Sequence, residues 1–464
     1  MPIWATEWVH WSSVRACVPV GVDVRGHFDG ASSEGLPVVV RQGIFVDTLR
    51  GGDLLPAQEL LEKYADVVIG VGLGVEKGDR VVISSRVQLP EFTRVLVATA
   101  YERGAESVDV LWQDDEVRRA RFSHGSSSAA GVVSGDSQFL MSAFEAGASW
   151  LWVLAEDPAA LSGVDMSRVQ EHQRVNGQFI KPMKDAMGAM EFPWSVIAAP
   201  VPAWNSSVFP DADLAEAEES MWSAIFRACR IDVEDPVSAW REHLAELERR
   251  RDALTERRFH KLRYEGPGTD LVVGLTDGVK WQGGGSKTHS GRSFAPNIPT
   301  EEVFTSPHRA KANGRIQASK PLSYFGDIID GFALEVSQGQ VVSFTAEQGQ
   351  EVLERVLATD EGSTRFGETA MVPQSGTVAA ERLIWNNMLY DENDACHIAL
   401  GQSFTSCLEG AADMSSADRL DAGLNQSSIH VDFVVGSSEL SVFGVYADGT
   451  EEPIITKGEW GFTI

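Results

Sequence analysis

The sequence predicts an α/β N-terminal domain with parallel βαβ units, followed by an α+β C-terminal domain built on a largely antiparallel sheet. Two observations predict this fold class. Residues 80–112 show the pattern strand, helix, strand within about 30 residues, which is typical of a parallel βαβ unit. Beyond residue 265 the chain carries short β-prone segments separated by glycine-rich turns, such as "TDLVVGL", "QVVSFTAE" and "ELSVFGVYA".

A chain of 464 residues has room for two or three domains. Residues 1–50 form an N-terminal extension without a sustained hydrophobic period, and they include the turn-rich "RGHFDGASSEG". The α/β domain is expected over residues 51–265 and the C-terminal domain over 266–464. The boundary is placed at "YEGPGTD" (264–270), which is expected to break the helix before it.

The first element of the α/β domain is a helix over residues 57–69, because apolar side chains recur there at helical spacing. The "GVGLG" that follows (70–74) is interpreted as the end of this helix. A dinucleotide-binding loop would instead leave a strand and open a helix. Next come a strand "RVVISS", a helix from Pro90 to Tyr101 closed by Gly104, and a strand at 107–112.

Two further helices close the α/β domain. One is acidic and amphipathic and covers residues 213–230. The other begins at Asp235-Pro236, where an acceptor side chain precedes a proline suited to the first turn. Its apolar stripe consists of Trp240, Leu244, Leu247 and Leu254. In the C-terminal half one helix is expected, at 349–358.

The composition excludes several classes of partner. A net charge of −28 repels nucleic-acid phosphates and anionic membrane surfaces. The four cysteines form no C-x-x-C pair, so a reducing, cytoplasmic environment is expected, without disulfides or a thiolate metal site. We expect no signal peptide and no membrane span, because no run of about 20 apolar residues occurs.

Two short segments suggest metal chemistry. In "IHVDFVVGS", His430 and Asp432 stand two residues apart on a β-prone run and therefore share a face. In "DENDACHIALG", Glu392 and His397 converge if a helix starts at Ala395. His243, a helical His260 and five other histidines are predicted to be surface or capping residues.

Four motifs, "APNIPTEEVFTSPHRAKANG", "FGETAMVP", "NNMLYDENDACHIALG" and "SSIHVDFVVGS", resemble in order and spacing the thermophilic aminopeptidase T family of metallopeptidases. The resemblance covers residues 58–461. It implies a site for two divalent metal ions in the C-terminal domain, with Glu368 as the bridging carboxylate. The implied ligands are Glu302, Glu368, Glu392, His397, His430 and Asp432. Oxygen and imidazole ligands suit zinc, cobalt or manganese.

The resemblance also implies an activity: hydrolysis of the N-terminal residue from peptides by a metal-activated water. Glu301 or Glu392 is the expected carrier of the proton to the leaving amine. Members of this family are typically homodimers, so a homodimer is expected. The sequence departs from the family at Phe404, because relatives commonly have a tyrosine there, seven positions after the first ligand histidine.

Two alternatives to the peptidase stay open. A phenyl ring cannot donate a hydrogen bond, so either Ser403, Thr405 or Tyr390 substitutes for the missing hydroxyl, or the chain is an impaired, peptide-binding relative. His397, His430 and Asp432 alone would also suit the single iron of a ring-cleaving dioxygenase. The additional acids Glu302, Glu368 and Glu392 argue against that second alternative, because a single iron does not require them.

Overall fold

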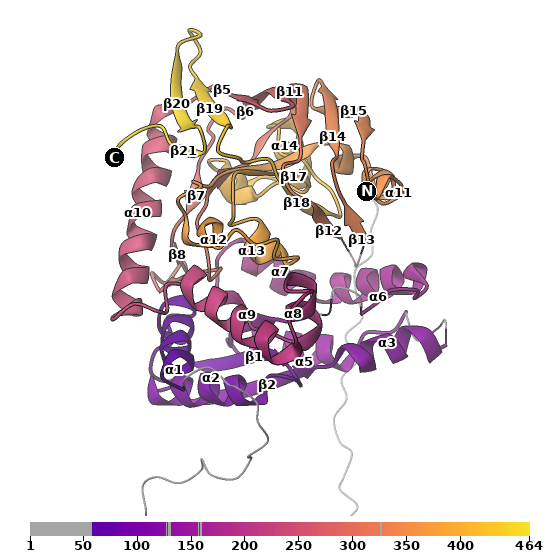
Figure 1. Cartoon of the computed structure of the whole chain (residues 1–464), viewed down its shortest axis with the longest axis vertical. Helices are drawn as coiled ribbons and strands as arrows, with labels where there is room; N and C mark the ends of the chain where they lie inside the picture. The colour runs from indigo at the N-terminus through magenta and orange to yellow at the C-terminus, as the bar shows by residue number, and fades with distance from the viewer. Residues whose placement is uncertain (1–57, 127, 129–130, 156, 158–159, 325–326) are drawn as a thin grey trace, which may run out of the picture. The chain divides into compact units, whose positions relative to one another are not determined.

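The computed structural model describes residues 58–464, except 127, 129–130, 156, 158–159 and 325–326. The predicted N-terminal extension (1–50) lies outside the described residues. A parallel sheet lies in the N-terminal half and antiparallel sheets in the C-terminal half, which confirms the predicted fold class (Figure 1). The domain boundary near residue 265 stays a prediction.

The parallel sheet has four strands in the order β2-β1-β3-β4. These strands are β1 (Arg80–Arg86), β2 (Ser107–Gln113), β3 (Ser149–Leu154) and β4 (Trp194–Ala198). Helix α2 (Pro90–Glu102) connects β1 to β2, which pair in parallel. The predicted βαβ unit is confirmed, and Gly104, at φ +96°, follows the end of its helix.

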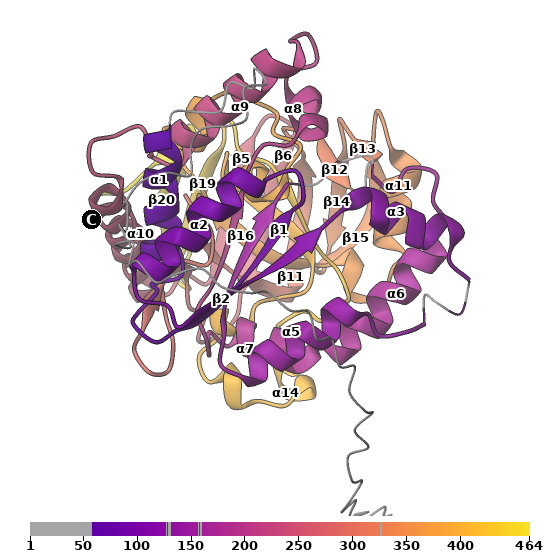
Figure 2. The same cartoon turned by 90° about the horizontal axis from the view of Figure 1, so that it is seen from below.

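Helices cover both faces of this sheet (Figure 2). The face with Val81 and Ile83 packs on α1 (Gln58–Val67), α2 and α9 (Leu214–Ala228). The face with Val82 and Trp150 packs on α5 (Gly135–Glu145) and α7 (Lys181–Gly188). Successive residues of β1 enter two different cores because neighbouring side chains of a strand point to opposite faces.

The glycine-rich segment after α1 ends a helix, as predicted. A π-helical turn (Val68–Gly72) continues α1, and the Leu73 N–H donates to the Val68 carbonyl at 2.9 Å. Gly74 then adopts φ +57°, and a Cβ there would lie 2.3 Å from the Ser293 carbonyl oxygen. Glycine is required at this position by both the backbone angle and the close approach.

Capping explains where the two long helices begin. The Asp213 side chain accepts from the backbone of Ala215 and Glu216 and completes a capping box at the start of α9. Asp235 caps α10 (Pro236–Arg257), whose predicted apolar stripe is buried. Among the described residues, no helix is both long and apolar enough to cross a membrane.

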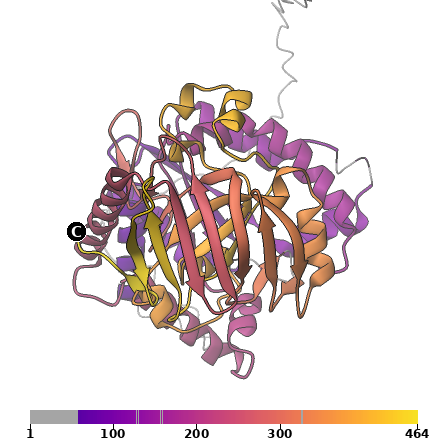
Figure 3. The same cartoon turned by 90° about the horizontal axis from the view of Figure 1, so that it is seen from above.

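Two large antiparallel sheets and two sheets of two strands form the C-terminal half. The largest has the order β15-β14-β11-β6-β5-β19-β20-β21 and is seen face-on in Figure 3. Its strands are β5 (Lys261–Gly266), β6 (Thr269–Leu275), β11 (Pro307–Gln317), β14 (Ala333–Ser337), β15 (Gln340–Thr345), β19 (Ser441–Val445), β20 (Glu451–Thr456) and β21 (Glu459–Trp460). The smaller of the two large sheets has the order β18-β17-β16-β10-β7. Its strands are β7 (Gln282–Gly283), β10 (Val303–Thr305), β16 (Phe366–Met371), β17 (His397–Gly401) and β18 (His430–Val434). One hydrophobic core includes residues of both sheets and of α11 (Gln350–Leu357), the helix predicted at 349–358.

Two local predictions at the start of this half were wrong. The segment 264–270 does not break a helix but forms the turn between β5 (Lys261–Gly266) and β6 (Thr269–Leu275). The helix has already ended at Arg257, because Arg258 takes a left-handed conformation with φ 50°. His260 consequently lies between α10 and β5 and not in a helix.

Arg292 connects the two halves of the chain. Its guanidinium donates to Asp79 Oδ1 at 2.9 Å and to the Gly74 carbonyl at 2.8 Å, both in the loop before β1. Arg292→Met should lower the free energy of unfolding by about 2 kcal/mol, because partly buried acceptors lose a charged donor. Urea denaturation measures this. As a control, Arg315→Met removes a half-exposed pair with Glu335 and should cost at most about 1 kcal/mol. Equal losses would contradict the argument.

Candidate metal centre

Adjacent strands of the smaller sheet place four of the predicted ligands on one face. Strand β16 carries Glu368, β17 begins with His397, and β18 carries His430 and Asp432. The register pairs Ala399 of β17 with Glu368 on one side and with Asp432 on the other. The alternate residues of β17 and β18 face the opposite way and join the hydrophobic core between the two sheets.

The side chains meet in two groups that share one carboxylate. Glu302, immediately before β10, has its Oε2 3.2 Å from His397 Nε2, and Glu368 Oε1 lies 3.9 Å from the same nitrogen. His430 Nε2 lies 3.0 Å from Glu368 Oε2 and 3.3 Å from Asp432 Oδ1. Within each group the ligand atoms lie within 4.8 Å of one another, and Glu368 belongs to both groups.

Burial and the charges of neighbouring side chains shift the pKa values of these carboxylates and histidines. Burial raises the pKa of Glu368 to about 7, and the neighbouring Glu302 and Asp432 charges add to the shift. Burial lowers the pKa of His397, but the Glu302 and Glu368 carboxylates outweigh this and raise it to about 10. The pKa of His430 is likewise raised, because Asp432 and Glu368 outweigh burial. The centre therefore favours positive charge, supplied by protons or by cations.

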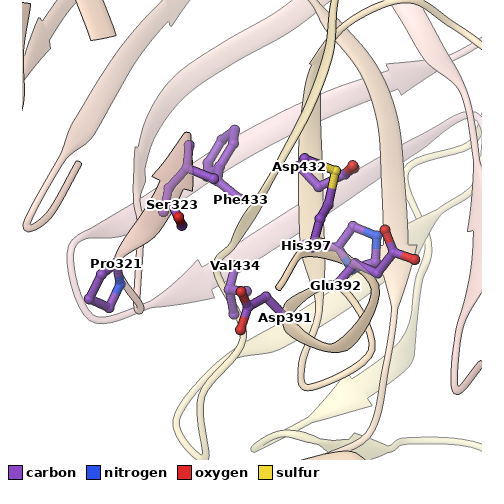
Figure 4. Close-up of a pocket in the computed structure, with 10 residues that line it drawn as sticks. Pro321, Ser323, Asp391, Glu392, His397, Asp432, Phe433 and Val434 are labelled. Carbon is purple, nitrogen blue, oxygen red and sulfur yellow. The ribbon is translucent and has the colours of Figure 1, made fainter. Parts of the chain in front are cut away.

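Glu392 reaches the centre in a different way from that predicted. The helix α13 (Met388–Asp391) ends just before Glu392, and β17 begins at His397, so no helix starts at Ala395. Glu392 still borders a small pocket together with His397 and Asp432 (Figure 4). It belongs to neither of the two groups. Burial, together with the Glu302 and Asp432 charges, holds the pKa of Glu392 well above its usual value.

The other acidic and amide side chains of "DENDACHIALG" shape the segment. The Asp391 carboxylate accepts from the backbone N–H groups of Trp385 and Asn387, at 3.2 and 2.9 Å. Asn393, fully buried, accepts from the Glu301 N–H at 2.6 Å and thereby ties this segment to the one that carries Glu302. Asp394 pairs with Lys320. One acid and one histidine thus reach the centre, and the remaining polar side chains hold the turn in place.

Glu301 is held as a fixed anion. Its oxygens lie 2.5 and 3.0 Å from the Arg230 guanidinium, and Thr377 Oγ1 donates to it at 2.9 Å. Burial raises the pKa of Glu301, but His243 and Arg230 outweigh burial and hold it below the usual value.

His243 was predicted to be a surface or capping residue, and this was wrong. It is largely buried, 3.7 Å from Glu301 and 2.7 Å from the Thr300 carbonyl.

Comparison with known proteins identifies the family. The sequence profile described as "Thermophilic metalloprotease (M29)" matches residues 57–460. The chain belongs to this M29 family. It is 40% identical to Aminopeptidase 2 of Geobacillus stearothermophilus over 87% of this chain and 98% of that protein. It is 41% identical to Aminopeptidase T of Thermus thermophilus over 86% and 98%. The solved structure "Wild-type AmpT from Thermus thermophilus" superposes with a TM-score of 0.82 and 38% identity, covering 87% of this chain and 100% of that one.

The centre fits the divalent metal that M29 metalloproteases use. Its donors are carboxylate oxygens and imidazole nitrogens, which suit zinc, cobalt or manganese. Asp432 Oδ1 is buried, and although His430 Nε2 lies 3.3 Å away, this oxygen accepts no hydrogen bond of normal geometry. A buried acceptor without a hydrogen bond is suited to bind a cation. The nearby Cys396 thiol takes no part, because it donates to the Val372 carbonyl at 3.3 Å.

Phe404 lies beside the centre in this M29 chain. Its ring packs against the His430 ring, with centroids 4.9 Å apart, and against Phe304 at 5.2 Å. Of the proposed substitute donors, Tyr390 is fully buried and stacks on Trp385, with ring centroids 4.3 Å apart. The Ser403 hydroxyl accepts from the Asn425 N–H and is almost completely buried. Of the three candidates, only Thr405 is not buried.

The pairing of Arg230 with Glu301 can be tested through stability. Arg230→Gln leaves a buried carboxylate without its partner and should lower the free energy of unfolding by about 3–5 kcal/mol in urea denaturation. Adding Glu301→Gln removes the uncompensated charge and should restore most of the loss.

Arg249→Gln, on α10, provides the control. Its partner is Glu246, and both side chains are exposed, so the expected loss is at most about 1 kcal/mol. A double variant that is less stable than Arg230→Gln alone would show that charge compensation is not the function of Arg230.

Proposed function

We propose that this M29 metalloprotease is an aminopeptidase that removes the N-terminal residue from peptides at a pair of divalent metal ions. The observation that carries the proposal is the pair of three-residue groups that share Glu368. The relatives named above are aminopeptidases by name, and the chain covers almost their full length.

Five of the six predicted ligands receive a place at the metals in this proposal. Glu302, Glu368 and His397 would hold one ion, and Glu368, His430 and Asp432 would hold the other. When bound, two such ions lower the pKa of a water molecule and stabilise the oxyanion that develops on the peptide carbonyl. The surrounding burial strengthens these electrostatic interactions by excluding bulk water.

Glu392 is our choice for the proton carrier. Its carboxylate borders the pocket beside His397, and burial, the largest cause of its raised pKa, favours uptake of a proton that Glu392 can then release to the leaving amine. Glu301, the other predicted carrier, is the weaker choice because Arg230 and Thr377 already occupy its oxygens. Glu392 as a sixth metal ligand is also the weaker assignment, because it lies outside both groups.

The remaining expectations concern the ions and the surroundings of the protein. Zinc, cobalt and manganese all suit the donor set. We also propose a cytoplasmic location, peptide substrates and a homodimer. Nucleic acid is an unfavourable partner because the net charge is −28.

Phe404 is the observation that supports a second candidate, an impaired relative that binds peptides without efficient turnover. A tyrosine at this position would add a hydroxyl to the ring that packs against His430 in this chain. The dioxygenase alternative is less favoured, because Glu302 and Glu368 add two anions to a set that a single iron would not require.

Turnover of aminoacyl-p-nitroanilides, measured together with metal content, tests the proposal. Protein loaded with zinc, cobalt or manganese should bind about two ions per chain and hydrolyse at least one substrate of the panel. His430→Ala should abolish turnover and reduce the metal content. His260→Ala, which changes an exposed histidine between α10 and β5, should affect neither quantity.

The other outcomes are distinct. Two bound ions without turnover on any substrate would favour the peptide-binding relative. A single iron per chain in protein purified without chelator and without added metal would favour the dioxygenase.

Restoring the family hydroxyl tests the importance of Phe404. Phe404→Tyr should raise kcat by up to about a hundredfold, because an oxyanion donor contributes on that order to the rate. Phe304→Tyr adds a hydroxyl to the neighbouring ring and should leave kcat unchanged. If kcat does not rise in Phe404→Tyr, another group already serves as the donor.

A further inference from the structure

The parallel sheet borders a cavity of about 600 Å³ that is separate from the metal centre. The carboxyl ends of β1, β2 and β3 form its floor, and α3 (Asp115–His124), α5 and α6 (Met166–Phe179) form its walls. It shares no lining residue with the pocket beside Glu392. In the order β2-β1-β3-β4 the chain passes from β1 to β2 on one side and then crosses to β3 on the other side of β1. The strand order therefore reverses direction at β1. Open α/β sheets bind ligands at the carboxyl ends of the strands where this reversal occurs.

One wall of the cavity is cationic, although the chain as a whole is strongly acidic. Arg118 and Arg121 lie one turn apart on α3, and Arg121 Nη1 lies 3.4 Å from His172 Nε2 on α6. Burial lowers the pKa of His172, and the charges of both arginines lower it further, against a smaller opposite effect of Asp136. The local potential at this wall is therefore positive.

Two acids at the cavity have hydrogen-bond partners other than Arg121. Asp114 Oδ1 accepts from the backbone N–H groups of Glu116 and Val117, at 2.9 and 3.2 Å, and caps α3. Asp115 pairs with Arg86 at 2.9 Å, and both side chains are buried. Among the described residues, Asp136 is the acid that acts on His172.

Hydrogen bonds hold this wall in place. Asn176 is buried, and its Nδ2 donates to the His172 carbonyl at 2.8 Å. Its Oδ1 accepts from the Ser134 N–H and from the Ser137 hydroxyl, both at 2.8 Å, and so joins α6 to the start of α5. The Phe122 ring packs edge-on against His172, with centroids 5.3 Å apart. The wall is built before a ligand arrives, which reduces the entropic cost of binding.

The other side of the cavity is apolar and open. Trp152 lines it and stacks on Trp150, with ring centroids 5.5 Å apart. Trp112 and Val117 also line it, yet they stay 43% and 59% exposed. Apolar surface that gathers around a concavity with a few placed charges is typical of small-molecule sites.

We propose that this cavity binds a small organic anion, whose carboxylate or phosphate contacts Arg121 and whose aromatic or aliphatic body packs on Trp112 and Trp152. Arginine forks suit both anions equally well. The size of the cavity is that of sites for ligands of one or two rings. The proposal does not depend on the peptidase activity.

Isothermal titration of the full-length protein with three probes tests the proposal. N-acetyl-tryptophan carries a carboxylate, AMP carries a phosphate, and N-acetyl-tryptophanamide carries no charge. At least one anion should bind with submillimolar Kd, and the tighter of the two identifies the anion class. The amide should bind at least about tenfold more weakly than N-acetyl-tryptophan if the carboxylate is the favoured anion.

Variants then locate the site. Arg121→Gln should weaken binding of the favoured anion by at least about tenfold, and Trp112→Ala should weaken it independently. Arg174→Gln, on the exposed side of α6 beside Glu171, should not change it. All three variants should keep the wild-type thermal midpoint and p-nitroanilide turnover. The proposal fails if no probe binds at up to about 10 mM, or if Arg121→Gln and Trp112→Ala both bind like the wild type.

Discussion

Alternation of side chains along paired strands is the constraint on which the metal centre depends. His430 and Asp432 lie two residues apart on β18, so both face the centre, while Val431 between them is buried in the core. A shift of one residue in the pairing would bury the ligands in an apolar core and expose the core residues. The packing of the two antiparallel sheets therefore fixes which side chains can meet at the candidate centre.

Concentrating acids in one buried place requires compensation, and the structure provides it in two ways. At the periphery, neighbouring acids have permanent partners: Arg230 neutralises Glu301, and Lys320 neutralises Asp394. At the centre only the two histidines oppose the carboxylates, and raised pKa values record the imbalance. Bound cations would compensate the negative charge that the two histidines leave at the centre.

The sequence predicts regular, local features well and distant partners poorly. The helical stripe of α10, the cap at Asp235 and the face shared by His430 and Asp432 all follow from spacing. Nothing in the spacing could link Glu301 to Arg230, 71 positions earlier, because the pairing depends on how the two halves pack. The prediction that His243 is a surface or capping residue was wrong for the same reason, because the burial of a side chain depends on tertiary packing.

The segment before Glu302 makes the centre depend on the N-terminal half as well. The Val196 N–H of β4 donates to the Pro296 carbonyl at 2.7 Å, and the Ile298 N–H donates back to the Val196 carbonyl at 3.0 Å. The segment before Glu302 is thus attached to the parallel sheet, whereas Val303, which follows it, pairs with Met371 of β16 in the antiparallel sheet. Glu302 lies between these two attachments, whereas Glu368, His430 and Asp432 lie within strands of the antiparallel sheet. The distance from Glu302 to His397 therefore depends on how the two halves pack, more than the distances among Glu368, His430 and Asp432 do.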